Sequence, residues 1–288
     1  LGGWHAAAGE DEAASIRLVH TAIDQGITFM DNAWEYHKGR AEEVMGKALA
    51  QDGYRQKAFL MTKNCARDYE GSKTHLEESL KRLRTDVIDL WQFHEINYDN
   101  DPDWVFERGV LKAALEAQKE GKVRYIGFTG HKDPRIHLKM LDKPFDWDTA
   151  QMPINVADAH YRSFQKEVVP VCLQKKVGVI GMKALGGGGT GEGLLVAGTD
   201  LTPAECFRYS LSLPVASQVV GLVNLDQLKQ AVAVARDFQP LADAEKQALL
   251  DRVAPEAGDG RHERFKSTQA FDSGTHRRQH GFPERRRS

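Results

Sequence analysis

Four polar residues stand at the ends of three successive apolar segments, or just beyond them. The segments GITFMD, AFLMTK and VIDLWQFH end at Asp31, Lys63 and His94, and Tyr36 follows Asp31 by five residues. In a barrel of parallel strands, the chemical groups come from the carboxyl ends of the strands. The sequence therefore predicts that an acid, a lysine, a histidine and a tyrosine meet at one end of the sheet.

These four residue types can together deliver a proton to an oxygen atom. A tyrosine has an ordinary pKa of about 10, and a nearby ammonium stabilises the tyrosinate and lowers this pKa. Lys63 can supply that ammonium to Tyr36, and Asp31 can keep it charged and in place. His94 can orient a substrate oxygen through a hydrogen bond. A purely structural ion pair between Asp31 and Lys63 is the competing interpretation.

The sequence contains no activated serine or cysteine nucleophile and no convincing cluster of metal ligands, so no metal site is predicted. Cys65, Cys172 and Cys206 are far apart and form no CxxC pair, which favours buried free thiols over disulfides. A proton donor without a nucleophile or a metal is typical of a reaction whose other half comes from a cofactor, such as hydride transfer.

Short apolar segments alternate with amphipathic ones along most of the chain. Such alternation predicts parallel strands that are buried on both faces and connected by helices. The expected strands cover residues 26–31, 58–63, 87–94, 122–129, 148–153, 177–183 and 217–223, with residues 1–4 as the remainder of one more. The expected helices cover residues 11–25, 40–50, 72–84, 104–119, 134–141, 164–176, 203–212 and 225–237.

Eight such units in about 240 residues predict an α/β fold of the TIM-barrel type, (β/α)8. A doubly wound open sheet is the main alternative, but it usually carries a phosphate-binding loop in its first unit, where this sequence has none. Residues 241–253 are expected to add one more helix to a catalytic barrel domain over residues 1–257. Residues 258–288 are polar and basic, and they are predicted to form an extended or partly disordered tail.

Composition limits the partners of the protein. Hydrophobic residues make up 41% of the chain and charged residues 28%, with a formal net charge of −2. This balance gives no field that would favour nucleic acid or an anionic membrane. No segment approaches the length of about 18 apolar residues that a membrane-spanning helix needs. A cytoplasmic location is expected, with a lost leader as the alternative because the sequence starts at Leu1. The oligomeric state stays open.

The sequence resembles the aldo-keto reductase family over nearly its whole length. DNAWEYHKGRAEEVMG resembles the signature segment of that family, MTKN its catalytic-lysine strand, and DLWQFHEIN its catalytic-histidine strand. The resemblance implies a catalytic tetrad of Asp31, Tyr36, Lys63 and His94, with Tyr36 as the general acid. It also implies NADPH as the usual hydride donor and an aldehyde or ketone as the small-molecule substrate.

The family resemblance further implies where the nicotinamide binds. In GKVRYIGFTG and TAQMPINV, Thr129 and Gln151 stand where the family holds the nicotinamide carboxamide. The serine–asparagine pair of the family is Thr129–Gly130 here, so one side chain of the pair is missing. Met182 stands where many members stack an aromatic ring on the nicotinamide, so the flat partner is absent or comes from elsewhere.

The phosphates are expected near a glycine loop, LGGGGTGEG, which begins with Leu185 and Gly186. Backbone amides of such a loop can cradle a pyrophosphate, and Lys183 beside it can reach a phosphate. The formal GxGxxG in this loop does not open directly into a helix, so a dinucleotide-binding fold is rejected. Gln227 matches a position that binds the adenosine 2′-phosphate. The Lys or Arg of strict NADPH users is absent there, so NADH remains an alternative cofactor.

Several further residues receive a provisional interpretation. Trp4 and Trp34 are expected to line the substrate mouth, and His37 is expected to be an exposed loop residue. His276 and His280 have the i, i+4 spacing of a helix face, but a metal site there is rejected because no third ligand is near. The RRR segment at 285–287 is interpreted as an exposed basic end rather than a site for an acidic partner.

The resemblance implies an N-terminal β-hairpin before the segment LGGWH. The barrel is therefore expected to lack this hairpin and to lose stability.

A regulatory subunit that binds NADP(H) with little turnover is the second functional hypothesis. It is kept because the stacking position is weakened and the tail is basic.

Overall fold

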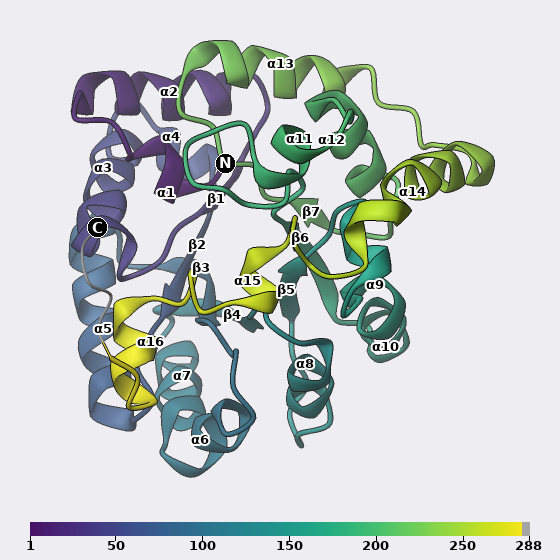
Figure 1. The fold of residues 1–288 in the computed structure, drawn as a ribbon. Coiled ribbons are helices and arrows are strands. Elements are labelled where there is room, and N and C mark those ends of the chain that lie inside the picture. The colour runs from purple at the N-terminus through teal and green to yellow at the C-terminus, as the bar shows by residue number, and fades with distance from the viewer. Residues whose placement is uncertain (284–288) are drawn as a thin grey trace.

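Seven parallel strands lie side by side in sequence order at the centre of the molecule, and helices surround them (Figure 1). This computed structural model describes residues 1–283, so the interpretation of the basic segment at 285–287 lies outside the described residues. The strands are β1 (Phe29–Asp31), β2 (Phe59–Asn64), β3 (Ile88–Phe93), β4 (Val123–Thr129), β5 (Thr149–Pro153), β6 (Gly178–Met182) and β7 (Ser217–Gln218).

The first two residues fill the gap between β1 and the end of β7. The backbone N–H of Asp31 donates to the carbonyl of Leu1 at 2.9 Å, and the N–H of Gly2 donates to the carbonyl of Val220 at 2.8 Å. A parallel bridge also links Gly2 to Asp31. The sheet is thus a nearly closed barrel, and the predicted (β/α)8 fold is confirmed.

Most expected helices are present with shifted ends. The larger helices are α2 (Glu12–Asp24), α3 (Arg40–Leu49), α5 (Tyr69–Leu83), α6 (Asp101–Glu107), α7 (Val110–Lys119), α8 (Pro134–Leu141), α10 (Val169–Lys175), α12 (Pro203–Leu211), α13 (Leu225–Arg236), and α14 (Asp243–Ala257). The short ones are α1 (Gly3–Ala6), α4 (Tyr54–Lys57), α9 (Phe164–Glu167), α11 (Leu194–Gly198), α15 (Arg264–Ser267) and α16 (Gly274–Gln279), with 3-10 turns η1 (Tyr36–Gly39) and η2 (Ala157–His160).

Two expected helices are each split in two. The segment 104–119 breaks at Gly109, whose φ of 78° is a left-handed conformation that favours glycine. The segment 164–176 breaks before Pro170, which has no N–H to donate to the preceding turn. By contrast, α12 begins as its sequence indicates, with Thr202 as N-cap and Glu205 completing a capping box.

Side chains of alternate strand residues fill the barrel in layers. Met61, Leu90 and Ile180 form a buried cluster, and Phe59 packs against it. Because side chains two residues apart in a strand share a face, Lys63 of β2 points to the same side as Phe59 and Met61. The apolar layers therefore form a floor beneath Lys63, at the carboxyl end of the barrel.

The prediction of an extended or partly disordered tail is wrong for residues 258–283. In Figure 1 this segment, with α15 and α16, crosses in front of the strands. Phe265 is 0% exposed. The Nζ atom of Lys266 lies 2.6 Å from Oδ1 of Asp158 and 2.7 Å from Oε2 of Glu263, and all three side chains are buried. These internal ion pairs explain how a polar sequence can pack. The domain boundary at 257/258 stays a prediction.

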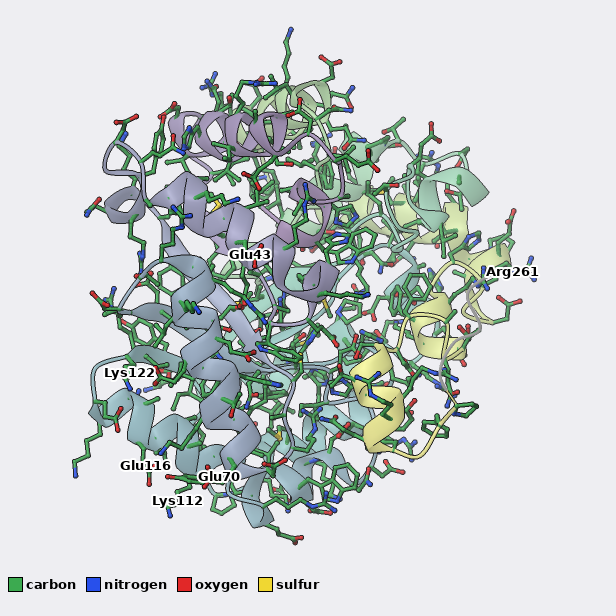
Figure 2. The ribbon with its side chains drawn as sticks, turned by 90° about the vertical axis from the view of Figure 1, so that its left-hand side faces the viewer. Glu43, Glu70, Lys112, Glu116, Lys122 and Arg261 are labelled. Atoms are coloured by element: carbon green, nitrogen blue, oxygen red, sulfur yellow. The ribbon has the colours of Figure 1, made fainter. Side chains whose placement is uncertain are left out.

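The outer face of the helices carries the charged side chains. Figure 2 shows Glu43, Glu70 and Lys112 on this face, and all three are exposed. Among residues 1–283, no helix has both the length and the apolar character needed to span a membrane.

Candidate active site

A cleft of about 580 Å³ opens at the carboxyl ends of the strands. This volume is within the usual range for a small-molecule site. The residues predicted for catalysis, cofactor binding and substrate binding that line it are Trp4, Asp31, Tyr36, Lys63, His94, Thr129, Gln151, Met182, Lys183 and Leu185. The structure therefore brings most of the predicted site into one cavity.

The ammonium of Lys63 lies at the centre of the predicted tetrad. Its Nζ atom is 2.5 Å from Oδ1 of Asp31, 2.6 Å from the backbone oxygen of Asn32 and 3.4 Å from the Tyr36 hydroxyl. Lys63 is only 1% exposed. Burial of an unpaired ammonium is unfavourable, so the carboxylate of Asp31 is needed to balance the charge.

Gln151 of β5 reaches across the barrel to the same carboxylate. Its Nε2 atom donates to Oδ2 of Asp31 at 2.6 Å. The side-chain oxygen of Gln151 is buried and has no hydrogen-bond partner within residues 1–283. A buried acceptor without a partner is costly, and it can be satisfied by a ligand that donates an N–H from the cleft.

Tyr36 holds its proton more firmly than the sequence predicts. Burial is the main cause that raises the pKa of Tyr36 well above its usual value, and the carboxylate of Asp31 adds to this effect. The net direction of the shift is therefore opposite to the lowered pKa of Tyr36 that the sequence predicts. The backbone turns sharply just after Tyr36, since His37 and Lys38 have left-handed φ angles of 50° and 58°.

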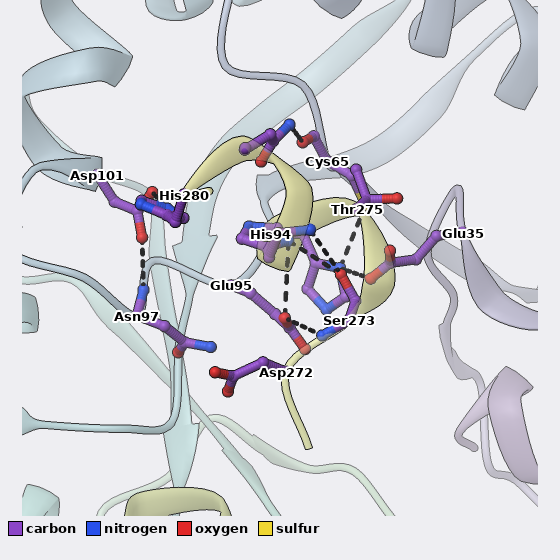
Figure 3. Close-up of polar contacts among 12 residues, drawn as sticks. Glu35, Cys65, His94, Glu95, Asn97, Asp101, Asp272, Ser273, Thr275 and His280 are labelled. Carbon is purple, nitrogen blue, oxygen red and sulfur yellow. Dashed lines mark hydrogen bonds and ion pairs between the residues drawn. The ribbon is translucent and has the colours of Figure 1, made fainter. Parts of the chain in front are cut away.

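The imidazole ring of His94 is neutral, and its polar contacts are at Nδ1. Burial lowers the pKa of His94 well below its usual value, and the Lys63 charge lowers it further. Nδ1 of His94 lies 3.2 Å from Oε1 of Glu35 and 3.3 Å from Sγ of Cys65 (Figure 3). The ring also meets Tyr36 edge to face at 5.6 Å. The Nε2 atom has no hydrogen-bond partner in the described part of the chain.

Lys183 and the glycine loop form another wall of the cleft. Burial lowers the pKa of Lys183 to about 8, against an opposing effect of Glu95. Lys183 and Glu95 both have left-handed backbones, with φ of 58° and 48°. Gly187 and Gly188, which line the cleft, also have positive φ. Such conformations turn backbone amides into a concave surface that can receive an anion.

Three predicted site residues do not line the cleft. Trp34 donates from Nε1 to Glu78 at 2.6 Å and stacks on His75, with ring centroids 3.6 Å apart. It therefore packs against α5, contrary to the expectation that it lines the mouth of the cleft. Gly186 and Gln227 are also absent from the lining.

Gly186 and Gln227 have local structural partners instead. The N–H of Gly186 donates to the carbonyl of Lys183 at 2.9 Å, which closes the turn after β6. The side-chain oxygen of Gln227 accepts from the N–H of Val223 at 2.9 Å, at the start of α13. In this structure neither residue lines the cleft, and their contacts with a cofactor stay a prediction.

Other cleft residues were missed by the sequence analysis. His37 is a lining residue rather than an exposed loop residue, because its Nε2 lies 2.7 Å from the backbone oxygen of Trp4 and the two rings stack. Residues 270–274 of the tail also line the cleft. The sequence signal for a packed tail was the pair Phe265 and Phe271 in an otherwise polar segment. The centroids of these two rings lie 6.1 Å apart.

Known proteins with similar sequences and structures define the family. The model of the Aldo/keto reductase family matches residues 1–193, and the chain belongs to this family, as predicted. Aldo-keto reductase YhdN and the oxidoreductase YrpG of Bacillus subtilis (strain 168) are each 32% identical to it, over 184 and 202 residues. These matches cover 59% and 62% of this chain, but 51% and 59% of the relatives, so the chain spans about half of their length.

Solved structures support the same barrel. The holo form of aldo-keto reductase AKR11C1 from Bacillus halodurans has a TM-score of 0.72 at 25% identity, over 87% of this chain and 90% of that one. An aldo-keto reductase from Klebsiella pneumoniae in complex with NADPH has a TM-score of 0.69 at 23% identity, over 88% of this chain and 90% of that one. The similarity to the Klebsiella pneumoniae structure shows that the two proteins share a fold.

Proposed function

We propose that the chain is an NAD(P)H-dependent oxidoreductase that reduces an aldehyde or ketone to an alcohol. The observation that carries the proposal is the buried ammonium of Lys63, which lies between the Asp31 carboxylate and the Tyr36 hydroxyl at the base of the cleft. This arrangement provides a proton donor and a positive charge at the place where an oxygen would gain negative charge. Membership of the aldo/keto reductase family supports the same reaction.

The cleft has groups that fit a nicotinamide nucleotide. The unpartnered side-chain oxygen of Gln151 can accept an N–H of the carboxamide, and Thr129 lines the cleft beside it in the neighbouring strand. Lys183 and the positive-φ glycines after it suit the phosphates. A bound nicotinamide supplies the hydride. NADPH is the proposed donor, since a structural relative is in complex with it, and NADH is the alternative.

The side chains of this protein supply the proton and orient the carbonyl. Tyr36 donates its hydroxyl proton to the carbonyl oxygen as that oxygen gains charge. The raised pKa of Tyr36 keeps the proton in place until then, and Lys63 stabilises the tyrosinate that remains. His94 is neutral, and when its Nδ1 accepts a hydrogen bond from the Cys65 thiol, its free Nε2–H can donate to the same carbonyl oxygen.

Replacing Tyr36 by phenylalanine tests the proton donor. Tyr36→Phe should lower kcat for a generic aldehyde by about 10²–10⁴-fold, while NADPH titration by fluorescence stays nearly unchanged. Tyr54→Phe is a matched control because Tyr54 hydrogen-bonds to Asp24 far from the cleft. Unchanged aldehyde reduction by Tyr36→Phe would falsify the assignment of Tyr36.

A nucleotide-binding sensor with little turnover is the second candidate function. It is favoured by Met182, which lines the cleft where many family members stack an aromatic ring. Stopped-flow measurement of the oxidation of bound NADPH by aldehydes and ketones separates the two functions. Rapid oxidation supports the reductase, whereas tight NADPH binding with no oxidation by any carbonyl of a broad panel supports the sensor.

A further inference from the structure

Three potential metal ligands of different chemistry converge on one side of the cleft. Oε1 of Glu35 and Sγ of Cys65 lie 3.2 and 3.3 Å from Nδ1 of His94 (Figure 3). The ligand atoms of these three residues all lie within 4.8 Å of one another. Glu35 comes from the loop after β1, and Cys65 and His94 directly follow β2 and β3, so the barrel itself fixes their spacing.

The spacing and the atom types suit a zinc ion. Zinc prefers thiolate, imidazole and carboxylate ligands at about 2.0–2.3 Å, in a tetrahedral arrangement. Two ligands of such a tetrahedron are about 3.3–3.7 Å apart, from the same bond lengths. The contacts of 3.2 and 3.3 Å are close to this spacing. The sulfur and nitrogen ligands disfavour magnesium and calcium, which prefer oxygen.

The charges around the cluster also favour a cation. In residues 1–283, neither Glu35 nor Glu95 has a lysine or arginine within ion-pair distance. Glu35 lies 3.2 Å from His94, and Glu95 lies 3.6 Å from His276. The nearby guanidinium of Arg67 is already paired with Asp101 at 2.9 Å. Glu35 therefore lies in the cleft wall without an ion pair to a lysine or arginine, which favours a cation beside it. Glu95 differs, because it accepts the N–H of Ser273 at 3.1 Å and interacts electrostatically with Lys183.

We propose that Glu35, Cys65 and His94 bind a zinc ion, whose fourth position faces the cleft. Glu35 and His94 line the cleft, so the ion has a path from solvent. On binding, the S–H bond of Cys65 breaks, the thiolate bonds to the metal in place of its hydrogen bond to His94, and the proton goes to solvent. The zinc-bound state is therefore distinct from the state proposed for carbonyl reduction. The second potential group, Glu35 with Glu95 and His276, shares one carboxylate with the first and contains no sulfur.

Calorimetric titration of the full chain, without a histidine tag, with ZnCl2 tests the site. We expect one zinc per chain, and Cys65→Ala and Glu35→Gln should each weaken binding by more than about tenfold. Cys172→Ala is the matched control, because Cys172 is equally buried and is no member of either ligand group. His276→Gln should also leave the affinity unchanged if the sulfur-containing group holds the ion.

Cobalt gives a second measurement on the unmodified chain, so the outcome does not depend on the folding of a variant. Co²⁺ bound by Cys65 should produce a thiolate-to-cobalt charge-transfer absorption that added Zn²⁺ removes. The proposal is overturned by absence of this absorption, by zinc affinity that Cys65→Ala leaves unchanged, or by loss of binding in His276→Gln alone.

Discussion

The side chains of Gln151 and Asp31 are joined across the barrel by a hydrogen bond of 2.6 Å. The other oxygen of Asp31 binds the ammonium of Lys63 at 2.5 Å. One carboxylate thus uses both oxygens to connect a residue proposed to hold the nicotinamide with a residue proposed to assist proton transfer. Removing its charge should therefore affect stability as well as turnover.

The first prediction concerns this carboxylate. Asp31→Asn leaves the buried ammonium of Lys63 without an opposite charge, and removal of one partner of a buried ion pair costs about 3–5 kcal/mol. The free energy of unfolding, measured by urea denaturation, should fall by that amount. Glu12→Gln is the control, because the Glu12–Lys47 pair is partly exposed and should contribute less than about 1 kcal/mol. Equal losses in the two variants would contradict the buried role of Asp31.

The second prediction concerns the C-terminal segment. Phe265→Ala removes a fully buried ring, and such truncations cost about 3–5 kcal/mol. The loss of packing should also release residues 258–283 and accelerate their cleavage by trypsin. Phe282→Ala, at a half-buried ring, should cost less and leave the cleavage rate nearly unchanged. If Phe265→Ala is as stable as the parent chain and as resistant to trypsin, the tail does not pack on the barrel as described.

The third prediction concerns the pH dependence of stability. His137 is buried, and burial lowers its pKa from 6.5 to about 4. Between pH 6.5 and 4 the unfolded state therefore binds more protons than the folded state, so stability falls as the pH falls through this window. The contribution of His137 is at most about 3 kcal/mol.

The matching experiment is urea denaturation of His137→Gln and the parent chain at several pH values. The variant should lose stability less steeply between pH 6.5 and 4. Some dependence will remain because burial also lowers the pKa of His75 and of His131 to about 4. Parallel stability curves for the two proteins would show that His137 does not titrate in this way.

The fourth prediction concerns the contact between α3 and α5. A Cβ atom on Gly46 would lie 2.2 Å from the backbone oxygen of Arg82, so the two helices can approach only at a glycine. Gly46→Ala should destabilise the fold by about 1–3 kcal/mol through overpacking. Gly258→Ala is a suitable control, since its Cβ would meet no atom within 4 Å. Thermal denaturation compares the two, and equal melting temperatures would argue against the close approach.

The meeting of Asp31 and Lys63 could be predicted because it depends on local properties of the sequence. Side chains alternate in direction along β2, which places Lys63 above Met61 near the carboxyl end of that strand. The order of the strands places Asp31 beside Lys63. The orientation of Trp34 could not be predicted in this way. Its ring turns away from the cleft because His75 and Glu78 of α5 provide a stacking surface and an acceptor.

The packing of the C-terminal tail could not be predicted from the sequence either. A polar segment without periodicity is typical of disorder, because it has little apolar area to bury. Here Lys266 is buried through two carboxylates, one of them Asp158, more than a hundred residues earlier. The raised pKa of Tyr36 was missed for a related reason, since burial of the hydroxyl is the largest cause of the shift. Both errors arise from tertiary surroundings that the residue types do not reveal.

The cleft is built from residues near both limits of the described chain, from Gly2 to residues 270–274. During synthesis, β1 to β7 leave the ribosome well before this last wall segment. Domains begin to fold while the chain is still growing. A chain that ends shortly after β7 therefore lacks residues 270–274 and with them one wall of the cleft. The complete cleft consequently requires the synthesis of nearly all the residues described.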